Sequence, residues 1–189
     1  MLTVFTKEYG KLQVKAAGVR RITSRRSSHV ELLNYSVLHV YKGAGLPVLT
    51  EAQTIDNFSP IKNNLIKVGY AYHLCELIDG LCPENQENRR VFLLLKNMLS
   101  QLSQHDTSVR EDYTIKTIEL ELHDEAPRTR FQATDHLSSA IQRFEIELLS
   151  VLGYWNRADV LSRNFDTHDF IETILERKLK SKKIFSKLQ

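Results

Sequence analysis

Four arginines fall within seven positions of this chain, between residues 20 and 26. Arginine carries a planar fork of donors that stays charged at physiological pH and matches the oxygens of a phosphate group. The hydroxyls of Thr23 and Ser24, with backbone N–H groups, add neutral donors beside it. A single charge run is often only a solvated surface. Two Arg pairs beside a Lys-bearing strand favour a nucleic-acid contact, made by Arg20, Arg21, Arg25 and Arg26.

The distribution of charge supports this hypothesis. Residues 1–48 hold eight Lys or Arg against two acidic residues, a net of +6, whereas the whole chain has a formal net charge of +3. A basic amino-terminal part joined to a mildly acidic remainder is typical of a polyanion-binding module attached to another unit. We therefore expect further phosphate contacts on the same face from Lys11, Lys15 and Lys42. Tyr9, Tyr35 or Tyr41 either stacks on bases or belongs to the core.

The elements that must position these residues are short strands. Residues 10–17 alternate apolar and polar, which predicts a strand with its lysines in water. Residues 1–6, 30–41 and 48–55 read as three more strands, separated by turn signals at 8–10 and 42–45. Four strands with such turns favour a small antiparallel barrel or sandwich. An open sheet would instead leave a strand edge with unpaired backbone groups, which another part of the protein must cover.

After Ser59-Pro60 the apolar period changes to that of helices. The first expected helix has an apolar face made of Leu65, Val68, Tyr72, Cys75 and Ile78. The second has Val91, Phe92, Leu95, Leu99 and Leu102, and a third over 140–152 ends at Gly153. Within the poorly defined segment 103–134, residues 115–122 fit a helix or a strand equally well. The scattered acidic side chains of the segment form either a solvated face or a metal site.

A last helix is expected over 170–188, with a strongly basic carboxyl end. Cations at a helix carboxyl end match the helix dipole, so this end is either a solvated terminus or a second contact for phosphate or an acidic peptide. The partner-binding residues in the second case are Arg177, Lys178, Lys182 and Lys183. Charge reversal at the last two would then abolish partner binding and leave DNA binding intact.

Motifs for catalysis or cofactors are missing from the sequence. There is no Gly-rich phosphate loop, no dinucleotide fingerprint and no zinc-protease motif, and the seven histidines are dispersed. Cys75 and Cys82 are too few for a disulfide scaffold and match no common metal spacing, so they are expected to be reduced thiols. No apolar run approaches the roughly 20 residues of a membrane span. The expectation is a non-enzymatic cytoplasmic, nucleoid-associated protein without cofactors.

An ordered set of short motifs resembles one bacterial family. They are Leu2-Thr3-Val4-Phe5-Thr6 with Gly10-Lys11, Ala17-Gly18-Val19-Arg20-Arg21 with Ser24, Tyr41-x-Gly43-x-Gly45-Leu46, residues 70–77, Phe92-x-Leu94-Leu95, Phe144-x-x-x-Leu148-Leu149 with Leu152-Gly153-Tyr154, and Leu179-Lys180-Ser181-Lys182. Together they resemble the recombination mediator RecO family, with residues 103–134 as the main gap. The resemblance implies an OB-type barrel followed by a helical domain.

The resemblance also implies a function and partners. These are binding of single- and double-stranded DNA, annealing, RecA loading together with RecR, and docking on the acidic carboxyl tail of single-stranded-DNA-binding protein. Two departures stand out. The first barrel strand of the family is missing here, so the start is truncated or the barrel closes differently. The four-cysteine zinc site of many members has no counterpart in residues 155–165, so the chain is expected to bind no structural zinc.

The prediction is therefore an α+β protein. Residues 1–58 form an OB-fold nucleic-acid-binding domain that lacks its first strand, and residues 59–189 form an all-helical domain. The leading function is a DNA-repair mediator that binds DNA through its arginines. The alternative is an adaptor whose basic helical domain captures an acidic peptide of a partner. A metal-dependent nuclease that uses the acidic segment 103–134 is a third hypothesis.

Overall fold

The computed structural model describes residues 1–21, 23–104, 132–154 and 166–181, with side chains omitted for 132–136. The elements follow the order β1 (Leu2–Thr6), β2 (Gly10–Val14), the 3-10 helix η1 (Ser28–Val30), β3 (Tyr35–Tyr41), β4 (Val48–Asp56), α1 (Ser59–Lys62), α2 (Leu65–Leu81), α3 (Arg89–Gln104), α5 (Gln132–Leu152) and α6 (Thr167–Leu175). Strands precede helices, which confirms the α+β class. No described helix is long and apolar enough to cross a bilayer.

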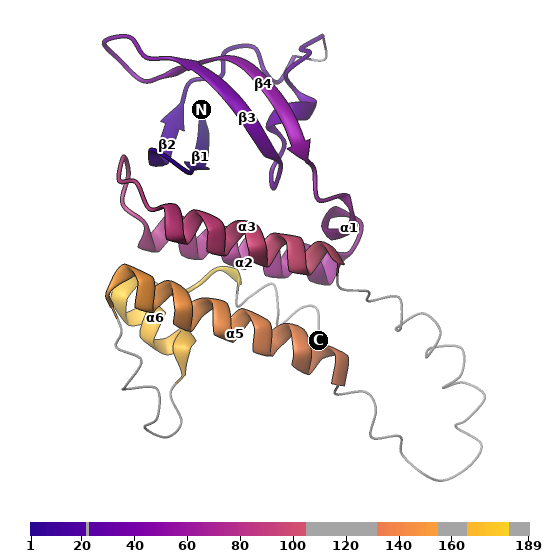
Figure 1. The fold of residues 1–189 in the computed structure, drawn as a ribbon, viewed down its shortest axis with the longest axis vertical. Helices are drawn as coiled ribbons and strands as arrows, with labels where there is room; N and C mark the ends of the chain where they lie inside the picture. The colour runs from indigo at the N-terminus through magenta and orange to yellow at the C-terminus, as the bar shows by residue number, and fades with distance from the viewer. Residues whose placement is uncertain (22, 105–131, 155–165, 182–189) are drawn as a thin grey trace, which may run out of the picture.

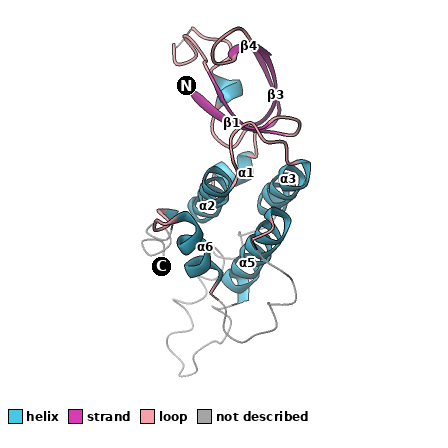
Figure 2. Cartoon of the chain, turned by 90° about the vertical axis from the view of Figure 1, so that its left-hand side faces the viewer, coloured by secondary structure: helices cyan, strands magenta, loops and turns pink. Residues whose placement is uncertain are grey.

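The described elements form three layers (Figure 1). The strands make the upper layer, α2 and α3 the middle one, and α5 and α6 the lower one. Figure 2 shows the same order from the side, with α2 above α6 and α3 above α5. One large apolar core runs through the helices and reaches Phe58 and Ile61, whereas a small core of Val14, Leu49 and Ala52 lies among the strands.

The four strands pair as two antiparallel hairpins, β1–β2 and β3–β4. A single parallel bridge joins them: Lys15 N donates to Pro47 O at 2.8 Å, and Leu49 N donates to Lys15 O at 2.9 Å. In the part of the chain that the structure describes, the strands do not close into a barrel. The third strand starts at Tyr35 and not at Val30, because residues 28–30 form η1 and Leu33 has a positive φ of 67°.

The predicted helix over 65–78 exists, but its predicted apolar face is only partly correct, since Ile78 is buried and Val68 and Cys75 are half-buried. Leu65 and Tyr72 are exposed. The buried positions of α2 are Lys67, Gly69, Ala71, His73, Leu74, Leu77, Ile78 and Leu81. These positions spread over two flanks because α2 lies between the strands and the lower helices (Figure 1). A helix packed from two sides has no single apolar stripe, so its periodicity misleads.

The helix expected over 170–188 ends instead at Leu175 and is followed by Glu176 with a φ of 52°. Two carboxylates hold the chain beyond it. Glu172 accepts a bond from Leu179 N at 2.9 Å, and Glu76 of α2 accepts bonds from Lys180 N and Ser181 N at 2.8 and 2.9 Å. The left-handed Glu176 ends the helix, and these bonds fix the path of the chain after it. The expected helical residues 182–188, like most of the acidic segment 103–134, lie outside the described residues.

A tight glycine contact seats the first hairpin on the loop after α2. Gly10 has a φ of 65°, and a Cβ there would lie 1.8 Å from Gln86 O. We expect Gly10→Ala to lower the free energy of unfolding by at least about 2 kcal/mol, since it combines a disfavoured φ with a clash against backbone. Urea denaturation measures this loss. Gly45→Ala is the control, because nothing lies within 4 Å of its Cβ position; equal stability of the two variants would contradict the prediction.

Candidate nucleic-acid interface

The arginine loop, residues 18–26, is a chain of tight turns between β2 and η1. It opens at Gly18, whose φ of 70° is readily adopted only without a side chain. Backbone bonds from Arg21 N to Gly18 O (3.1 Å) and from Ser24 N to Arg21 O (2.9 Å) coil it tightly. Val19 is buried and anchors the loop. Arg20, Arg21 and Arg25 are left exposed to solvent, as a phosphate contact requires.

Arg26 differs from the other three arginines because the protein's own backbone binds it. Its Nη1 donates to Leu49 O at 2.7 Å, and its Nη2 donates to Ala17 O at 3.2 Å. These bonds tie the arginine loop to β4 and satisfy two carbonyls beside the small strand core. Arg26 therefore has a structural role, and we do not expect it to contact phosphate.

The structural role of Arg26 predicts that Ala substitutions at positions 25 and 26 have different effects on the free energy of unfolding. Arg26→Ala is expected to lower the free energy of unfolding by about 1.5–3 kcal/mol, because two charge-assisted bonds are lost. Arg25→Ala, at an exposed position, should change it by less than about 0.5 kcal/mol. Urea denaturation of both variants provides the comparison. A stable Arg26→Ala protein would show that these bonds contribute little.

Lys11 was expected to face water and does not. It is only 9% exposed. Its Nζ donates to the backbone carbonyl of Asp79 and lies 3.5 Å from Asp79 Oδ1, which fastens β2 to α2. Because this ammonium group is buried and bonded to Asp79, we do not expect Lys11 to contact phosphate.

Lys15 and Lys42 are exposed, and the strand pairing brings them to the same end of the β3–β4 hairpin. Lys15 bridges Val48, and Val48 is the partner of Tyr41 across the β3–β4 hairpin. Lys42 follows Tyr41 directly. Arg26 binds Leu49 at the same end. The exposed cations of the strand layer, which we call the basic surface, are Lys15, Arg20, Arg21, Arg25 and Lys42. The arginine loop and the β3–β4 turn lie on opposite sides of this layer (Figure 1).

The three candidate tyrosines divide between solvent and core. Tyr9 is 65% and Tyr41 66% exposed, so both rings are open to stacking. Tyr35 packs 6.2 Å from the ring of Phe92 on α3, and Lys96 Nζ lies 4.8 Å from its centroid. Tyr35 is thus part of the contact between strands and helices. Tyr41, beside Lys42, is the tyrosine that adjoins the basic surface.

Two family models match successive stretches of the chain. The family described as "Recombination protein O N terminal" matches residues 1–58, and "Recombination protein O C terminal" matches residues 62–123. The chain belongs to the RecO family. The basic surface lies wholly within the stretch that matches the amino-terminal part of this family.

Individual relatives agree with the family assignment. The chain is 32% identical over 124 residues to DNA repair protein RecO of Roseiflexus sp. (strain RS-1), which covers 66% of the chain and 42% of that protein. It is 34% identical over 122 residues to DNA repair protein RecO of Dehalococcoides mccartyi, covering 65% and 47%. For the protein of that name from Acetivibrio thermocellus the identity is 28% over 154 residues, covering 82% and 50%. The chain thus spans half or less of the length of these RecO relatives.

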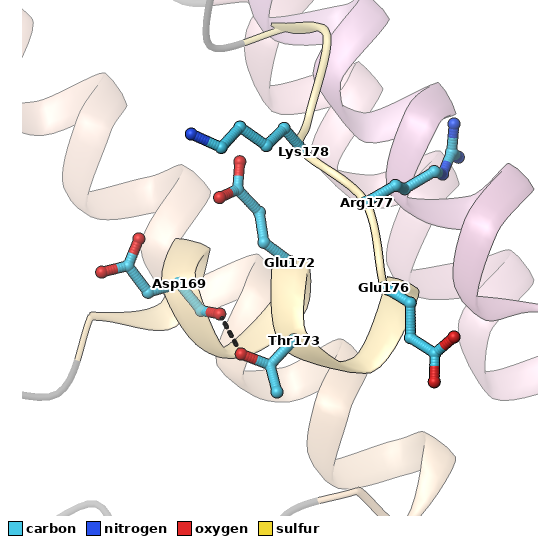
Figure 3. A pocket seen from close by; sticks show the side chains of 6 residues that line it. All are labelled: Asp169, Glu172, Thr173, Glu176, Arg177 and Lys178. Atoms are coloured by element: carbon cyan, nitrogen blue, oxygen red, sulfur yellow. Dashed lines mark hydrogen bonds between the residues drawn. The ribbon is translucent and has the colours of Figure 1, made fainter.

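The segment after α6 carries the partner-binding residues expected in this RecO-family chain. Arg177 and Lys178 are exposed and help to line an open pocket, and Figure 3 shows their side chains pointing to opposite sides. The same pocket is lined by the acidic Asp169, Glu172 and Glu176. The surface is therefore of mixed charge rather than uniformly basic. Lys182 and Lys183 lie outside the described residues.

Glu76 fixes the path of this carboxyl-terminal segment. Desolvation works to raise the pKa of Glu76, but the bonds from Lys180, the bonds from Ser181 and the charge of Arg177 outweigh it and lower the pKa below its ordinary value. The ionised form is therefore bound more strongly in the folded state than the neutral form.

The lowered pKa of Glu76 sets the sign of a pH dependence. Its contribution to stability is present above the unfolded-state pKa and is lost as the pH falls through the folded-state value. Glu76→Gln should lower the free energy of unfolding at pH 7 by about 1–2 kcal/mol and flatten its decline in acid. Denaturation at a series of pH values tests this, with the exposed Glu87→Gln as control. A variant that declines in acid as steeply as the wild type would contradict it.

Sequence reasoning missed a buried polar cluster between α2, α5, α6 and the carboxyl-terminal segment. His73 is fully buried; its Nε2 lies 2.7 Å from Glu145 Oε1, and its Nδ1 lies 2.8 Å from Ser181 Oγ. Thr167 Oγ1 donates to Glu145 Oε2, and His168 Nε2 lies 3.6 Å from Glu145 Oε1. One signal in the sequence could have indicated this cluster. Glu145 shares the apolar face of its helix with Ile141 and Leu148, and a charged side chain buried on such a face requires a partner.

Proposed function

We propose that this chain is a non-enzymatic DNA-repair and recombination protein whose residues 1–58 bind single- and double-stranded DNA. The observation that carries the proposal is the basic surface: three exposed arginines of one loop, with exposed Lys15 after β2 and exposed Lys42 in the β3–β4 turn, all belong to the strand layer. Exposed Tyr41 adjoins this surface and offers a ring on which a base can stack.

The chemistry of the basic surface suits phosphate more than base edges. Arginine forks and lysine charges bind phosphate oxygens of any sequence, so affinity should depend on salt and only weakly on sequence. Five such cations match a stretch of several nucleotides. A surface of this kind can hold two complementary strands near each other by neutralising both, which is the basis of the proposed annealing activity.

An annealing assay tests the proposal. Two complementary oligonucleotides with donor and acceptor dyes are mixed at about 50 mM salt with and without the chain. We expect the chain to accelerate pairing and the acceleration to vanish at about 0.5 M salt, where counterions compete for the phosphates. Failure to bind or anneal either strand at low salt would overturn the proposal.

Support for a more specific role in recombination comes from the relatives, which are named DNA repair proteins. We propose that the complete activity includes RecA loading together with RecR, and that residues 59–189 provide the protein contacts. The exposed Arg177 and Lys178 support a second candidate function, the capture of the acidic carboxyl tail of single-stranded-DNA-binding protein. Charge reversal at Lys178, Lys182 and Lys183 should abolish binding of an acidic peptide and leave DNA binding intact; unchanged peptide binding would overturn this second function.

A further inference from the structure

The buried cluster described above gathers three metal-ligating side chains from three separate helices. His73 comes from α2, Glu145 from α5 and His168 from the first turn of α6. One ligand atom of each residue lies within 4.8 Å of the others. His73 and Glu145 are completely buried, and the side chain of His168 is 37% exposed. The cluster is therefore a pocket of nitrogen and oxygen ligands closed on one side and open to solvent through His168.

We propose that His73, Glu145 and His168 bind a divalent transition-metal ion, with Zn²⁺ as the expected ion. Two imidazoles and one carboxylate form a common three-residue ligand set for zinc, and a water molecule completes the tetrahedron. The open side at His168 is where such a water would lie. The donor set is unsuited to Mg²⁺ or Ca²⁺, which prefer oxygen ligands throughout.

The distances are compatible with metal binding after a small adjustment. Zinc bonds of about 2.0–2.2 Å place the ligand atoms of a tetrahedral site about 3.4 Å apart. His168 Nε2 is already 3.6 Å from Glu145 Oε1, whereas His73 Nε2 is closer, at 2.7 Å. The His73–Glu145 pair must open by less than 1 Å. The ligand atoms now lie within 4.8 Å of one another, so the widest separation must close, and His168, which lies at the start of a helix and is partly exposed, can approach.

Outer groups hold two of the ligands in the orientation that a metal requires. Ser181 Oγ lies 2.8 Å from His73 Nδ1, which leaves Nε2 directed at the cluster. Thr167 Oγ1 donates to Glu145 Oε2, which leaves Oε1 directed at both imidazoles. Such outer hydrogen bonds accompany nearly all metal-binding histidines and carboxylates. Without a metal, the same contacts make a closed hydrogen-bonded cluster, so the site does not need an ion to fold.

The two thiols of the chain are poor competitors for the ion. Burial, together with the charge of Asp79, raises the pKa of Cys75 to about 11. Burial also raises the pKa of Cys82 to about 11, although the nearby Lys11 acts against it. A thiol must lose its proton to bind zinc, so at neutral pH these two residues bind it weakly.

The full chain, treated with a chelator and exchanged into metal-free buffer, is titrated with Zn²⁺ by calorimetry and with Co²⁺ by visible absorption. We expect one ion per chain and cobalt bands typical of a tetrahedral site. Ser181→Ala should weaken binding by about 10- to 100-fold, and His168→Gln, which removes a ligand, by more. Zn²⁺ should raise the melting temperature of the wild type and not that of His168→Gln.

His39→Gln is the matched control, since His39 is exposed on β3, far from the cluster in the chain; it should bind Zn²⁺ as the wild type does. His168→Gln is preferred to a change at His73 because its partly exposed side chain can be replaced without opening the core. The proposal is overturned if the folded wild type binds neither ion, if His168→Gln binds as tightly as the wild type, or if cobalt produces the strong charge-transfer band of a thiolate ligand.

Discussion

Simultaneous replacement of Arg20, Arg21 and Arg25 with Ala is expected to weaken binding of single-stranded DNA by about 100-fold at about 0.1 M salt. Each phosphate contact on a single strand contributes about 0.7 to the slope of log affinity against log salt. Loss of three contacts should therefore reduce the magnitude of this slope by about 2. Fluorescence anisotropy of a labelled oligothymidine across a salt series measures both quantities.

The control for this experiment removes the same charge elsewhere. Arg143, Lys178 and Lys180 are exposed and belong to the lower helices and the segment after them, away from the strand layer (Figure 1). Their triple Ala variant should retain the wild-type slope within about 0.5. If both triple variants lose affinity equally, net charge and not the arginine loop governs binding, and the proposed interface is wrong.

Glu145→Ala is expected to be the most destabilising single change, lowering the free energy of unfolding by about 3–5 kcal/mol. The substitution removes the carboxylate that pairs with Nε2 of fully buried His73 and accepts from the Thr167 hydroxyl, and so leaves these two groups poorly satisfied in the core. Urea denaturation in the presence of a chelator measures the loss without any contribution from bound metal.

Glu147→Ala on the same helix is the matched control, because Glu147 is exposed. It should change the stability by less than about 0.5 kcal/mol. A double-mutant cycle with His73→Ala then isolates the coupling between the two buried side chains, which we expect to exceed about 1 kcal/mol. Similar losses for the two glutamate variants would show that the cluster adds nothing specific to stability.

Features determined by local sequence were predictable. Alternation and turn residues indicated the four strands, and Gly153 marked the end of α5, where it has a φ of 81°. The exposure of Arg20, Arg21 and Arg25 also followed from local chemistry, because a charged side chain in a turn has no reason to be buried.

Features that depend on tertiary contacts were not predictable in this way. Lys11 lies on the expected polar face of its strand, but α2 covers that face and supplies the partner Asp79. The helix expected over 170–188 ends at Leu175, and Glu76, about one hundred residues away in the chain, binds the backbone of Lys180 and Ser181 beyond it. His73 and Glu145 are 72 residues apart, so no spacing rule connects them. In each case the deciding partner is distant in sequence.

The location of bound DNA tests the central claim most directly. Ultraviolet cross-linking of the chain to an oligothymidine, followed by mass spectrometry of the linked peptides, identifies the surface that contacts the bases. We predict that cross-links concentrate in residues 9–26 and 35–42, with Tyr41 as a major site, and that they disappear at high salt together with binding. Cross-links confined to α2, α5 or α6 would place the DNA on the helices and contradict the account.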